Sequence, residues 1–470
     1  MRISVKVWNV GVSFAAIALL WAVPGAGQGA TQASRHDTPW SIPPDAAIKE
    51  LLAQRTEHNR VGIVIGVIEA GNTRIVAHGN SGGPDPRPLD GDSVFQIGSV
   101  TKVFTGLLLA DMVQRGEVGI EDPAAKYLPS NVKMPERGRA ITLLDLSKHW
   151  SALPSMPTNF SLSASPDPYE GYTVAQLYEF LSTYELPREP GKQAYSNLGV
   201  ALLGQLLTAR AGTDYETLLR RRVLDPLGLR STSITLNADQ KRRLAIGHDR
   251  YLEPVETWEL RAMPASGSLR SSANDLLTFL EFNLGERDSP LHDAMLYQRT
   301  PMRALGWGRA QLGGEEVYGH EGGKEGYRSA ILFNPARRTG VVVLMNARTD
   351  ERPIALAQHL LYSDHPLPPA PRAPERPAIP ALDAQAFERL AGTYRLESGA
   401  EVSVARSRDH LLVNVGGEGV STFFPMSKHE FFSNTDDARI VFRISTDDRA
   451  AELLLYEGAA ERRAVRLDRR

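Results

Sequence analysis

The sequence of 470 residues contains no cysteine. That absence excludes disulfide bonds, thiolate nucleophiles and metal sites with cysteine ligands. The histidines do not indicate a metal site either, because no second histidine or carboxylate stands at a usual ligand spacing from His320. We therefore expect no bound metal.

The chain also lacks an excess of charge of one sign. It carries 53 Lys and Arg against 55 Asp and Glu, a net charge of −2. The chain has no excess of positive charge that would attract the phosphates of a nucleic acid, so nucleic acid is excluded as a partner. The 42% of hydrophobic and 23% of charged residues are typical of a soluble globular protein, and the length allows two or three domains.

Long apolar runs are missing after the N-terminus. The one long apolar run, Val10 to Val23 (VGVSFAAIALLWAV), follows Arg2 and Lys6 and precedes small residues at 25–27. A membrane anchor needs about 20 apolar residues, so this shorter run favours a secretory signal peptide over residues 1–27. A lipid anchor is excluded because no cysteine follows. We expect a periplasmic or secreted protein with no integral membrane segment after cleavage.

Hydrophobic patterning predicts an α+β domain. Runs of β-branched residues around short turns predict one hairpin at 61–78 and another at 327–345. Between them, apolar residues recur at the helical period from Ser99 to a stop at Gly116, and further helical stretches follow. Strands thus bracket a helical middle, which indicates one sheet closed by distant parts of the chain.

A proline-rich segment separates this region from the C-terminus. Residues 366–380 (PLPPAPRAPERPAIP) are nearly half proline, which makes the chain stiff and extended. We predict a linker over 363–380. Short strand-like runs with Gly, Asn and Asp between them then predict a small antiparallel β domain over 381–470, consistent with a barrel.

Ser99 and Lys102 place a hydroxyl and an amine three residues apart at a predicted helix start, so both project from one face. Serine is a poor nucleophile until a base takes its proton. A lysine one turn away can do so if burial or a nearby cation lowers its pKa. Taken alone, the pair is equally compatible with an ordinary helix cap.

Tyr195 and Asn197 lie at the entrance of another predicted helix. A phenol near a lysine ammonium has its phenolate favoured, and it can act as a base for the serine or an acid for the leaving group. The Asn197 amide offers a donor and an acceptor to Lys102 or to a substrate amide. By itself, the tripeptide Tyr-Ser-Asn also fits a turn and helix cap.

His320, Gly322 and Gly323 precede the predicted strand at 327, so we expect them on or beside an edge strand. Glycines there let a substrate backbone approach and leave the Gly323 N–H free to point at an oxyanion. The alternative is a glycine-rich hairpin with an exposed histidine.

A rival nucleophile is Ser81, because residues 79–83 (GNSGG) fit the G-x-S-x-G pattern of α/β-hydrolases. That pattern requires a helix directly after the serine. Prolines at 84, 86 and 88 forbid such a helix, so we interpret the segment as a loop.

In order, spacing and flanking sequence, the three motifs resemble the penicillin-recognising serine hydrolases, a superfamily of class C β-lactamases, DD-peptidases, D-aminopeptidases and related family VIII esterases. The resemblance covers 45–362. It implies a β-lactamase/transpeptidase-like antiparallel sheet flanked by helices, with a helical subdomain. The matching segments are 95–102 (FQIGSVTK), 190–199 (PGKQAYSNLG), 306–308 (GWG) and 320–323 (HEGG).

The resemblance also implies roles. Ser99 would be the acylated nucleophile, Lys102 its proton partner, Tyr195 the general acid or base, and Asn197 a ligand of the substrate amide. The N–H groups of Ser99 and Gly323 would form the oxyanion hole. No cofactor is implied.

Two segments depart from the family pattern. His320 stands where β-lactamases and DD-peptidases usually carry Lys-Thr-Gly, and with Gly322 it resembles the His-x-Gly branch. A histidine of ordinary pKa is mostly neutral at pH 7, so it does not replace the ammonium that attracts a substrate carboxylate. Lys324 or Arg328 are candidate replacements. Trp150 stands where relatives have a Thr-Ser-Gly-like stretch, as a pocket wall or a core residue.

These observations predict a serine hydrolase that cleaves a β-lactam or a D-amino-acid peptide through an acyl-enzyme. The alternatives are a carboxylesterase of the same fold and a penicillin-binding protein without turnover. A small-molecule or peptide substrate is expected, with cell-wall peptide as a candidate. The sequence does not indicate an oligomeric state.

Overall fold

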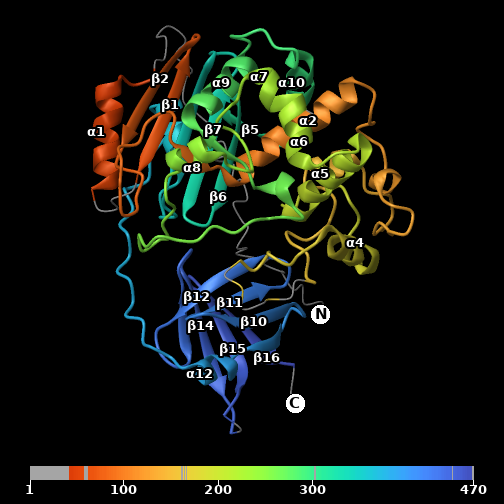
Figure 1. Cartoon of the computed structure of the whole chain (residues 1–470), viewed down its shortest axis with the longest axis vertical. Coiled ribbons are helices and arrows are strands. Elements are labelled where there is room, and N and C mark those ends of the chain that lie inside the picture. Colours follow the sequence, from red (N-terminus) through yellow and green to blue (C-terminus); the bar gives the residue numbers. More distant parts are fainter. Residues whose placement is uncertain are drawn as a thin grey trace, which may run out of the picture. The chain divides into compact units, whose positions relative to one another are not determined.

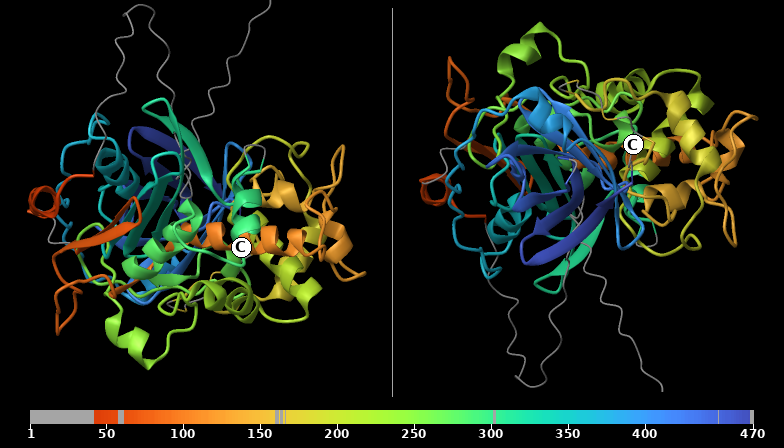
Figure 2. Two further views of the ribbon diagram at one scale, coloured as in Figure 1. Left: turned by 90° about the horizontal axis from the view of Figure 1, so that it is seen from above. Right: turned by 90° about the horizontal axis from the view of Figure 1, so that it is seen from below.

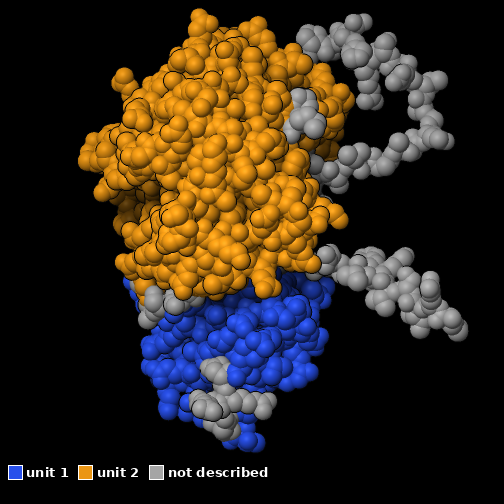
Figure 3. Space-filling view, turned by 90° about the vertical axis from the view of Figure 1, so that its right-hand side faces the viewer, with its two compact units in different colours: residues 1–20, 162–164, 378–470 blue, residues 21–161, 165–377 orange. Residues whose placement is uncertain are grey.

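The computed structural model describes residues 42–57, 62–159, 162, 165, 167–300, 303–446 and 448–467. The predicted signal peptide lies outside these residues. Two compact units emerge, a larger one with the described residues up to 377 apart from residue 162, and a smaller one formed mainly by those from 378 onward (Figure 3). Within the described part of the chain, no helix is long and apolar enough to cross a bilayer.

A six-stranded antiparallel sheet lies at the centre of the larger unit (Figure 1), in the order β2-β1-β8-β7-β6-β5. Strand β1 pairs with β8 along its whole length, from Ile63 opposite Met345 to Glu69 opposite Thr339. The beginning and end of the unit therefore meet in the middle of the sheet. The strands are β1 (Ile63–Glu69), β2 (Asn72–His78), β5 (Gly308–Leu312), β6 (Glu315–Lys324), β7 (Tyr327–Asn334) and β8 (Thr339–Met345).

Helices cover both faces of this sheet, as the end views of Figure 2 show. On one face, Leu52 of α1 and Leu356 of α11 share a buried cluster with alternate residues of β1. On the other face, Leu277 of α9 packs so closely on Gly66 of β1 that a Cβ there would lie 2.9 Å from it. The sheet helices are α1 (Asp45–Thr56), α9 (Ala273–Leu284) and α11 (Pro353–Leu361).

The remaining helices form the helical part of the unit. Helix α2 is its centre, because every residue from Thr101 to Met112 is buried. A two-stranded sheet of β3 (Val94–Gln96) and β4 (Arg270–Ser272) leads into it. The helices are α2 (Thr101–Gln114), α3 (Leu143–Ser147), α4 (Val174–Thr183), α5 (Asn197–Ala211), α6 (Tyr215–Leu219), α7 (Asp225–Leu227), α8 (Ala238–Arg243) and α10 (His292–Arg299), with short turns η1 (Gly98–Val100), η2 (Ala124–Tyr127), η3 (Arg220–Leu224) and η4 (Pro264–Ser266).

The smaller unit is a closed antiparallel barrel in the order β10-β11-β12-β13-β14-β15-β16-β9. Closure pairs every strand edge, and the interior is filled by side chains such as Tyr394, Phe423 and Phe431. Phe387 of α12 joins the same core. The elements are α12 (Ala384–Glu388), β9 (Gly392–Leu396), β10 (Glu401–Ser407), β11 (His410–Val415), β12 (Val420–Pro425), β13 (Glu430–Ser433), β14 (Ala438–Ile444), β15 (Ala450–Glu457) and β16 (Ala460–Arg466).

The predicted α+β class, antiparallel sheet and C-terminal barrel are confirmed. The structure adds three barrel strands that the sequence did not indicate, β12, β13 and β16. In β16 the sequence AERRAVR is dominated by charge, and only Ala464 is buried. Its pairing with β15 and β9 depends on the closed barrel and not on local propensity.

Because the barrel has its own core, we expect a fragment of residues 378–470 to fold alone. Its circular dichroism should show β structure and a cooperative thermal transition. Phe431→Ala removes a fully buried ring and should cost the fragment about 3–5 kcal/mol. A fragment that is unfolded, or whose melting ignores this change, would contradict an independent barrel core.

Candidate active site

Ser99 lies in the turn η1, directly before the buried helix α2. Gly98 precedes it with φ 48°, in the left-handed region. A Cβ on Gly98 would lie 2.6 Å from the carbonyl oxygen of Gly323 and 2.9 Å from its nitrogen. The turn η1 and the end of β6 therefore touch main chain to main chain, which no larger residue at 98 would allow.

Lys102 is buried one turn into α2, with 1% of its surface exposed. Its Nζ lies 2.9 Å from Ser99 Oγ, 2.7 Å from Asn197 Oδ1 and 2.5 Å from the Ser266 carbonyl oxygen. All three oxygens are neutral, so the lysine has no counter-charge in contact. As a neutral amine it has two N–H groups, for Asn197 and Ser266, and its lone pair is left for the Ser99 hydroxyl. Burial holds the pKa of Lys102 well below its usual value, which favours the neutral amine that a base requires.

The Tyr195 hydroxyl donates to Ser99 Oγ at 2.7 Å. Lys102 Nζ lies 5.0 Å from the centre of the Tyr195 ring. The sequence-based expectation of a favoured phenolate is not met, because burial raises the pKa of Tyr195. Lys102 is then the better base, and Tyr195 is a neutral proton donor in contact with the same oxygen.

Asn197 is the first residue of α5, whose N-cap is Ser196. Its Oδ1 accepts from Lys102, and its Nδ2 donates to Ser155 Oγ at 3.3 Å. The Leu198 N–H donates to the Ser155 carbonyl at 2.9 Å. The amide is thus held from two sides, with its oxygen turned to the lysine.

His149 supports Tyr195 from behind. The two rings lie 4.4 Å apart at an angle of 32°, and His149 Nδ1 accepts from the Ser196 N–H at 3.2 Å. Burial, with Lys102 nearby, lowers the pKa of His149 to about 3, so the ring is neutral. Trp150 beside it is half-buried, and its ring lies 4.8 Å below Lys148 Nζ.

The end of β6 provides the opposite side of the site. Its neighbour β5 pairs only as far as Gly319, so residues 320–324 pair with β7 alone and their other edge turns to η1. A Cβ on Gly322 would lie 2.0 Å from the Ile97 carbonyl. Ser329 of β7 also donates to that carbonyl, at 2.9 Å. The segment is therefore one strand in from the sheet edge, and the edge that β5 leaves unpaired packs on η1.

His320 is buried, and its Nδ1 lies 2.7 Å from the Glu321 carbonyl oxygen. Burial and the nearby Lys102 lower its pKa to about 3. The ring is therefore neutral throughout the physiological range and carries no fixed positive charge toward a substrate. The alternative of a hairpin with an exposed histidine is excluded.

The two candidate replacements for the missing cation are already engaged. Lys324 is buried and pairs with Glu325 at 2.8 Å. Arg328 stands opposite Gly323 on β7 and donates from Nε to the Thr349 carbonyl at 2.9 Å. These contacts do not direct either side chain toward Ser99.

The structure keeps Ser81 apart from this site. It is buried between β2 and β3, and its N–H donates to the Arg87 carbonyl at 2.9 Å. No helix follows it. Among the residues that the structure describes, no group of three or more histidines and carboxylates could hold a metal.

Comparison with known proteins places the chain in a family. The sequence profile described as "Beta-lactamase" matches residues 45–363. The chain belongs to the β-lactamase family. It is a β-lactamase-related serine hydrolase. A second profile, described as "Domain of unknown function (DUF3471)", matches residues 376–467.

Two curated relatives of this hydrolase are similar over about half of its chain. The D-alanyl-D-alanine-carboxypeptidase/endopeptidase AmpH of Escherichia coli (strain K12) is 29% identical over 278 residues, which is 54% of this chain and 71% of the relative. A "Beta-lactamase" of Pseudomonas fluorescens is 26% identical over 273 residues, 56% of this chain and 72% of the relative.

Solved structures support the same fold. The class C β-lactamase from Rhodobacter sphaeroides superimposes with a TM-score of 0.60 at 26% identity, over 68% of this chain and 98% of that chain. The octameric penicillin-binding protein homologue from Pyrococcus abyssi has a TM-score of 0.59 at 21% identity and covers 89% of this chain and 99% of that chain.

The site of the hydrolase contains partners that sequence reasoning missed. The Ser266 carbonyl is a backbone acceptor, so its residue type carries no signal. His149 begins the segment 149–154 that departs from the family pattern, and Ser155 directly follows that segment. His149 (φ 59°) and Ala152 (φ 63°) both adopt left-handed backbone without being glycine, which indicates that tertiary packing imposes this loop.

Gly322→Ala should impair folding and catalysis together, because its Cβ would meet the Ile97 carbonyl. We expect a loss of about 1–3 kcal/mol in the free energy of unfolding of the larger unit. Gly171→Ala is the matched control, since nothing lies within 4 Å of a Cβ at 171. Equal thermal stability of the two variants would contradict the close approach of β6 to η1.

The neutral state of His320 can be measured directly by NMR of ¹³C-labelled histidine, with its resonance assigned by loss in His320→Gln. A pKa of about 3 lies below the ordinary value near 6.5, so the folded protein should show no His320 titration between pH 8 and 5. A midpoint near pH 6.5 would contradict the buried, neutral ring.

Proposed function

We propose that this hydrolase cleaves an amide, either a β-lactam or the peptide bond of a D-amino-acid peptide, through an acyl-enzyme on Ser99. The observation that carries the proposal is the position of Ser99 Oγ, 2.9 Å from Lys102 Nζ and 2.7 Å from the Tyr195 hydroxyl. A hydroxyl held between a neutral amine and a phenol is arranged for proton removal and nucleophilic attack. The activities for which the two curated relatives are named are consistent with these substrates.

In acylation, the neutral Lys102 amine takes the Ser99 proton as Oγ attacks the substrate carbonyl carbon. The carbonyl oxygen becomes an oxyanion, for which the N–H groups of Ser99 and Gly323 are the proposed donors. The C–N bond then breaks, and the leaving nitrogen takes a proton from Tyr195, which Lys102 restores. Ser99 is left as an ester of the acyl group.

In deacylation, water attacks the ester carbonyl and gives its proton to the same base. The Ser99 oxygen leaves and recovers a proton, so the enzyme is regenerated. Asn197 serves both half-reactions by holding Lys102 through its oxygen, while Gly322 allows the strand to approach the nucleophile. No step requires a cofactor or a metal.

A carboxylesterase activity is the second candidate, and the neutral His320 favours it. Without a fixed cation at this position, a substrate carboxylate gains little from binding, so uncharged acyl esters become competitive. The same nucleophile and oxyanion donors serve an ester, from which an alcohol leaves in place of an amine.

We also propose that the protein is exported after cleavage of the predicted signal peptide over 1–27 and that its natural substrate is a small molecule or a cell-wall peptide. The hydrolase domain would span 45–362, with a linker over 363–380 and a C-terminal β domain over 381–470. The apolar N-terminal run and the proline-rich segment support this division.

Intact mass spectrometry with a penicillin tests the mechanism. Ring opening releases no fragment, so acylation should add the full mass of the drug to the wild-type protein, and Ser99→Ala should gain nothing. Tyr195→Phe should acylate about 10²- to 10⁴-fold more slowly. Lys102→Arg should be inactive, because an arginine cannot act as a base. Ser81→Ala is the matched serine control and should behave like wild type.

An adduct that persists would identify a penicillin-binding protein without turnover, and rapid drug hydrolysis a working β-lactamase. If neither adduct nor hydrolysis appears, D-amino-acid amides and short esters are tested with the same variants. Normal turnover of any substrate by Ser99→Ala, or loss of activity in Ser81→Ala, would overturn the assignment of the nucleophile.

A further inference from the structure

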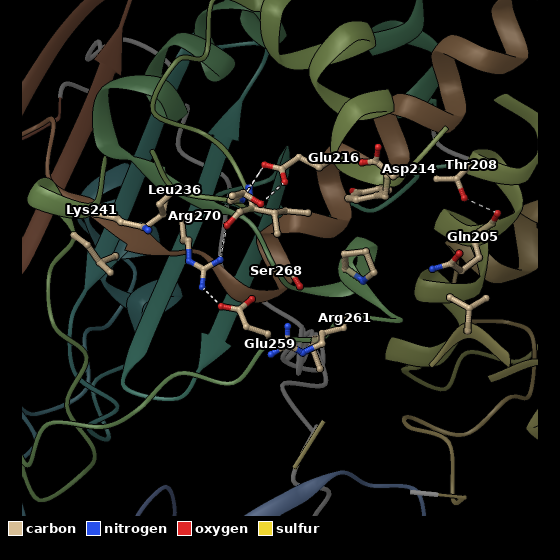
Figure 4. Close-up of a pocket in the computed structure, with 17 residues that line it drawn as sticks. Gln205, Thr208, Asp214, Glu216, Leu236, Lys241, Glu259, Arg261, Ser268 and Arg270 are labelled. Atoms are coloured by element: carbon tan, nitrogen blue, oxygen red, sulfur yellow. Dashed lines mark hydrogen bonds and ion pairs between the residues drawn. The ribbon is translucent and has the colours of Figure 1, made fainter. Parts of the chain in front are cut away.

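A cavity lies in the larger unit beside the turn η4. It has a volume of about 720 Å³ and is lined from the second half of α5, from α6, from α8 with the segment before it, and from residues 259–270 (Figure 4). Apolar side chains such as Ile234, Leu236 and Leu260 form part of its wall. Its size and mixed lining are those of a small-molecule site.

The acidic groups of this cavity already have protein partners. Glu216 accepts from the N–H groups of Ile234 and Thr235 at 2.9 and 2.8 Å and from the Thr235 hydroxyl at 2.8 Å. Glu259 pairs with Arg270, as Figure 4 shows. Asp214 caps α6 by accepting from the Thr217 N–H.

Several donors, in contrast, have hydrogen-bonding capacity left. Arg270 is 7% exposed, and its two Nη groups donate to the Ile234 carbonyl and to the Glu259 carboxylate. Its buried Nε has no hydrogen-bond partner among the described residues. Neither the hydroxyl of Ser268 nor the exposed Nζ of Lys241 has a hydrogen bond or ion pair with another described residue. Arg261 reaches Asp167 only at 4.0 Å.

We propose that this cavity binds a small organic carboxylate with an apolar body. Its carboxylate would meet the spare donors of Lys241, Ser268 and Arg261, and its apolar part would lie against the wall of Ile234, Leu236 and Leu260. A cation is disfavoured, because the carboxylates that would receive it are already engaged.

The geometry also couples the cavity to the catalytic lysine through η4. Pro264 lines the cavity, whereas the Ser266 carbonyl of the same turn accepts from Lys102 Nζ. A second link runs through Tyr215, which lines the cavity and whose hydroxyl lies 2.7 Å from Thr105 Oγ1. Thr105 in turn donates to the Ala265 carbonyl at 2.8 Å. A ligand that shifts η4 therefore changes the position of the acceptor that holds Lys102.

Calorimetric titration of the full chain with 4-phenylbutanoate tests binding, since this probe has no bond that a hydrolase can cleave. We expect a Kd of about 1 mM or tighter, with binding at least tenfold weaker for the uncharged 4-phenylbutan-1-ol. Lys241→Glu should weaken the acid at least tenfold. Lys133→Glu makes the same charge change at an exposed lysine that does not line the cavity and should bind like wild type.

Equal binding of acid and alcohol, or equal binding of the acid by Lys241→Glu and wild type, would overturn the site.

The coupling between the cavity and Lys102 is measured by the turnover of a reporter β-lactam or ester. A saturating concentration of the acid should change kcat at least twofold, with less change in KM. Thr105→Val, which cuts one link, should still bind the acid but show a smaller effect on kcat. A pure KM effect would overturn the coupling. The coupling rests on the proposed role of Lys102, but the binding titration does not, so the two failures are distinguishable.

Discussion

The chemistry proposed for this hydrolase depends on a lysine that is buried without a counter-charge. Three neutral oxygens surround Lys102 Nζ, from Ser99, Asn197 and Ser266. Each stabilises the position of the amine, and none stabilises its positive charge as a carboxylate would. The low dielectric of the interior therefore favours the neutral form, which is the form able to take a proton from serine. A carboxylate at any of these three positions would favour the ammonium and remove the base.

The rest of the larger unit holds three distant segments around that amine. The turn η1 with helix α2 carries Ser99 and Lys102, α5 brings Asn197, and η4 provides the Ser266 carbonyl. Strand β6 then closes the site from the sheet, and this is possible because Gly98 and Gly322 allow backbone to touch backbone. The same approach brings the proposed oxyanion donors, the N–H groups of Ser99 and Gly323, to one side of the site.

The local sequence pattern predicted the secondary structure correctly where neighbouring residues determine it. The helix starting at Ser99, the hairpin strands β1 and β2, and the antiparallel barrel follow from periodicity and turn residues. Charged β16 did not, because only barrel closure makes it a strand. The protonation state of Tyr195 was not predictable either: a phenol beside an ammonium favours phenolate, whereas the structure buries Tyr195 and reverses that preference. A mostly neutral His320 at pH 7 was expected, and burial lowers its pKa further.

By itself, the sequence determined the residue types available for catalysis and their order, Ser99 with Lys102, Tyr195 with Asn197, and His320 with its glycines. It also excluded cysteine chemistry and the rival serine in the loop at 79–83, since cysteine is absent and proline forbids the helix that the rival needs. Only the tertiary structure decided which groups touch, which are neutral, and that a backbone carbonyl at 266 completes the site. The physical reason is that burial and contact depend on segments far apart in the chain, and no local pattern encodes a backbone acceptor.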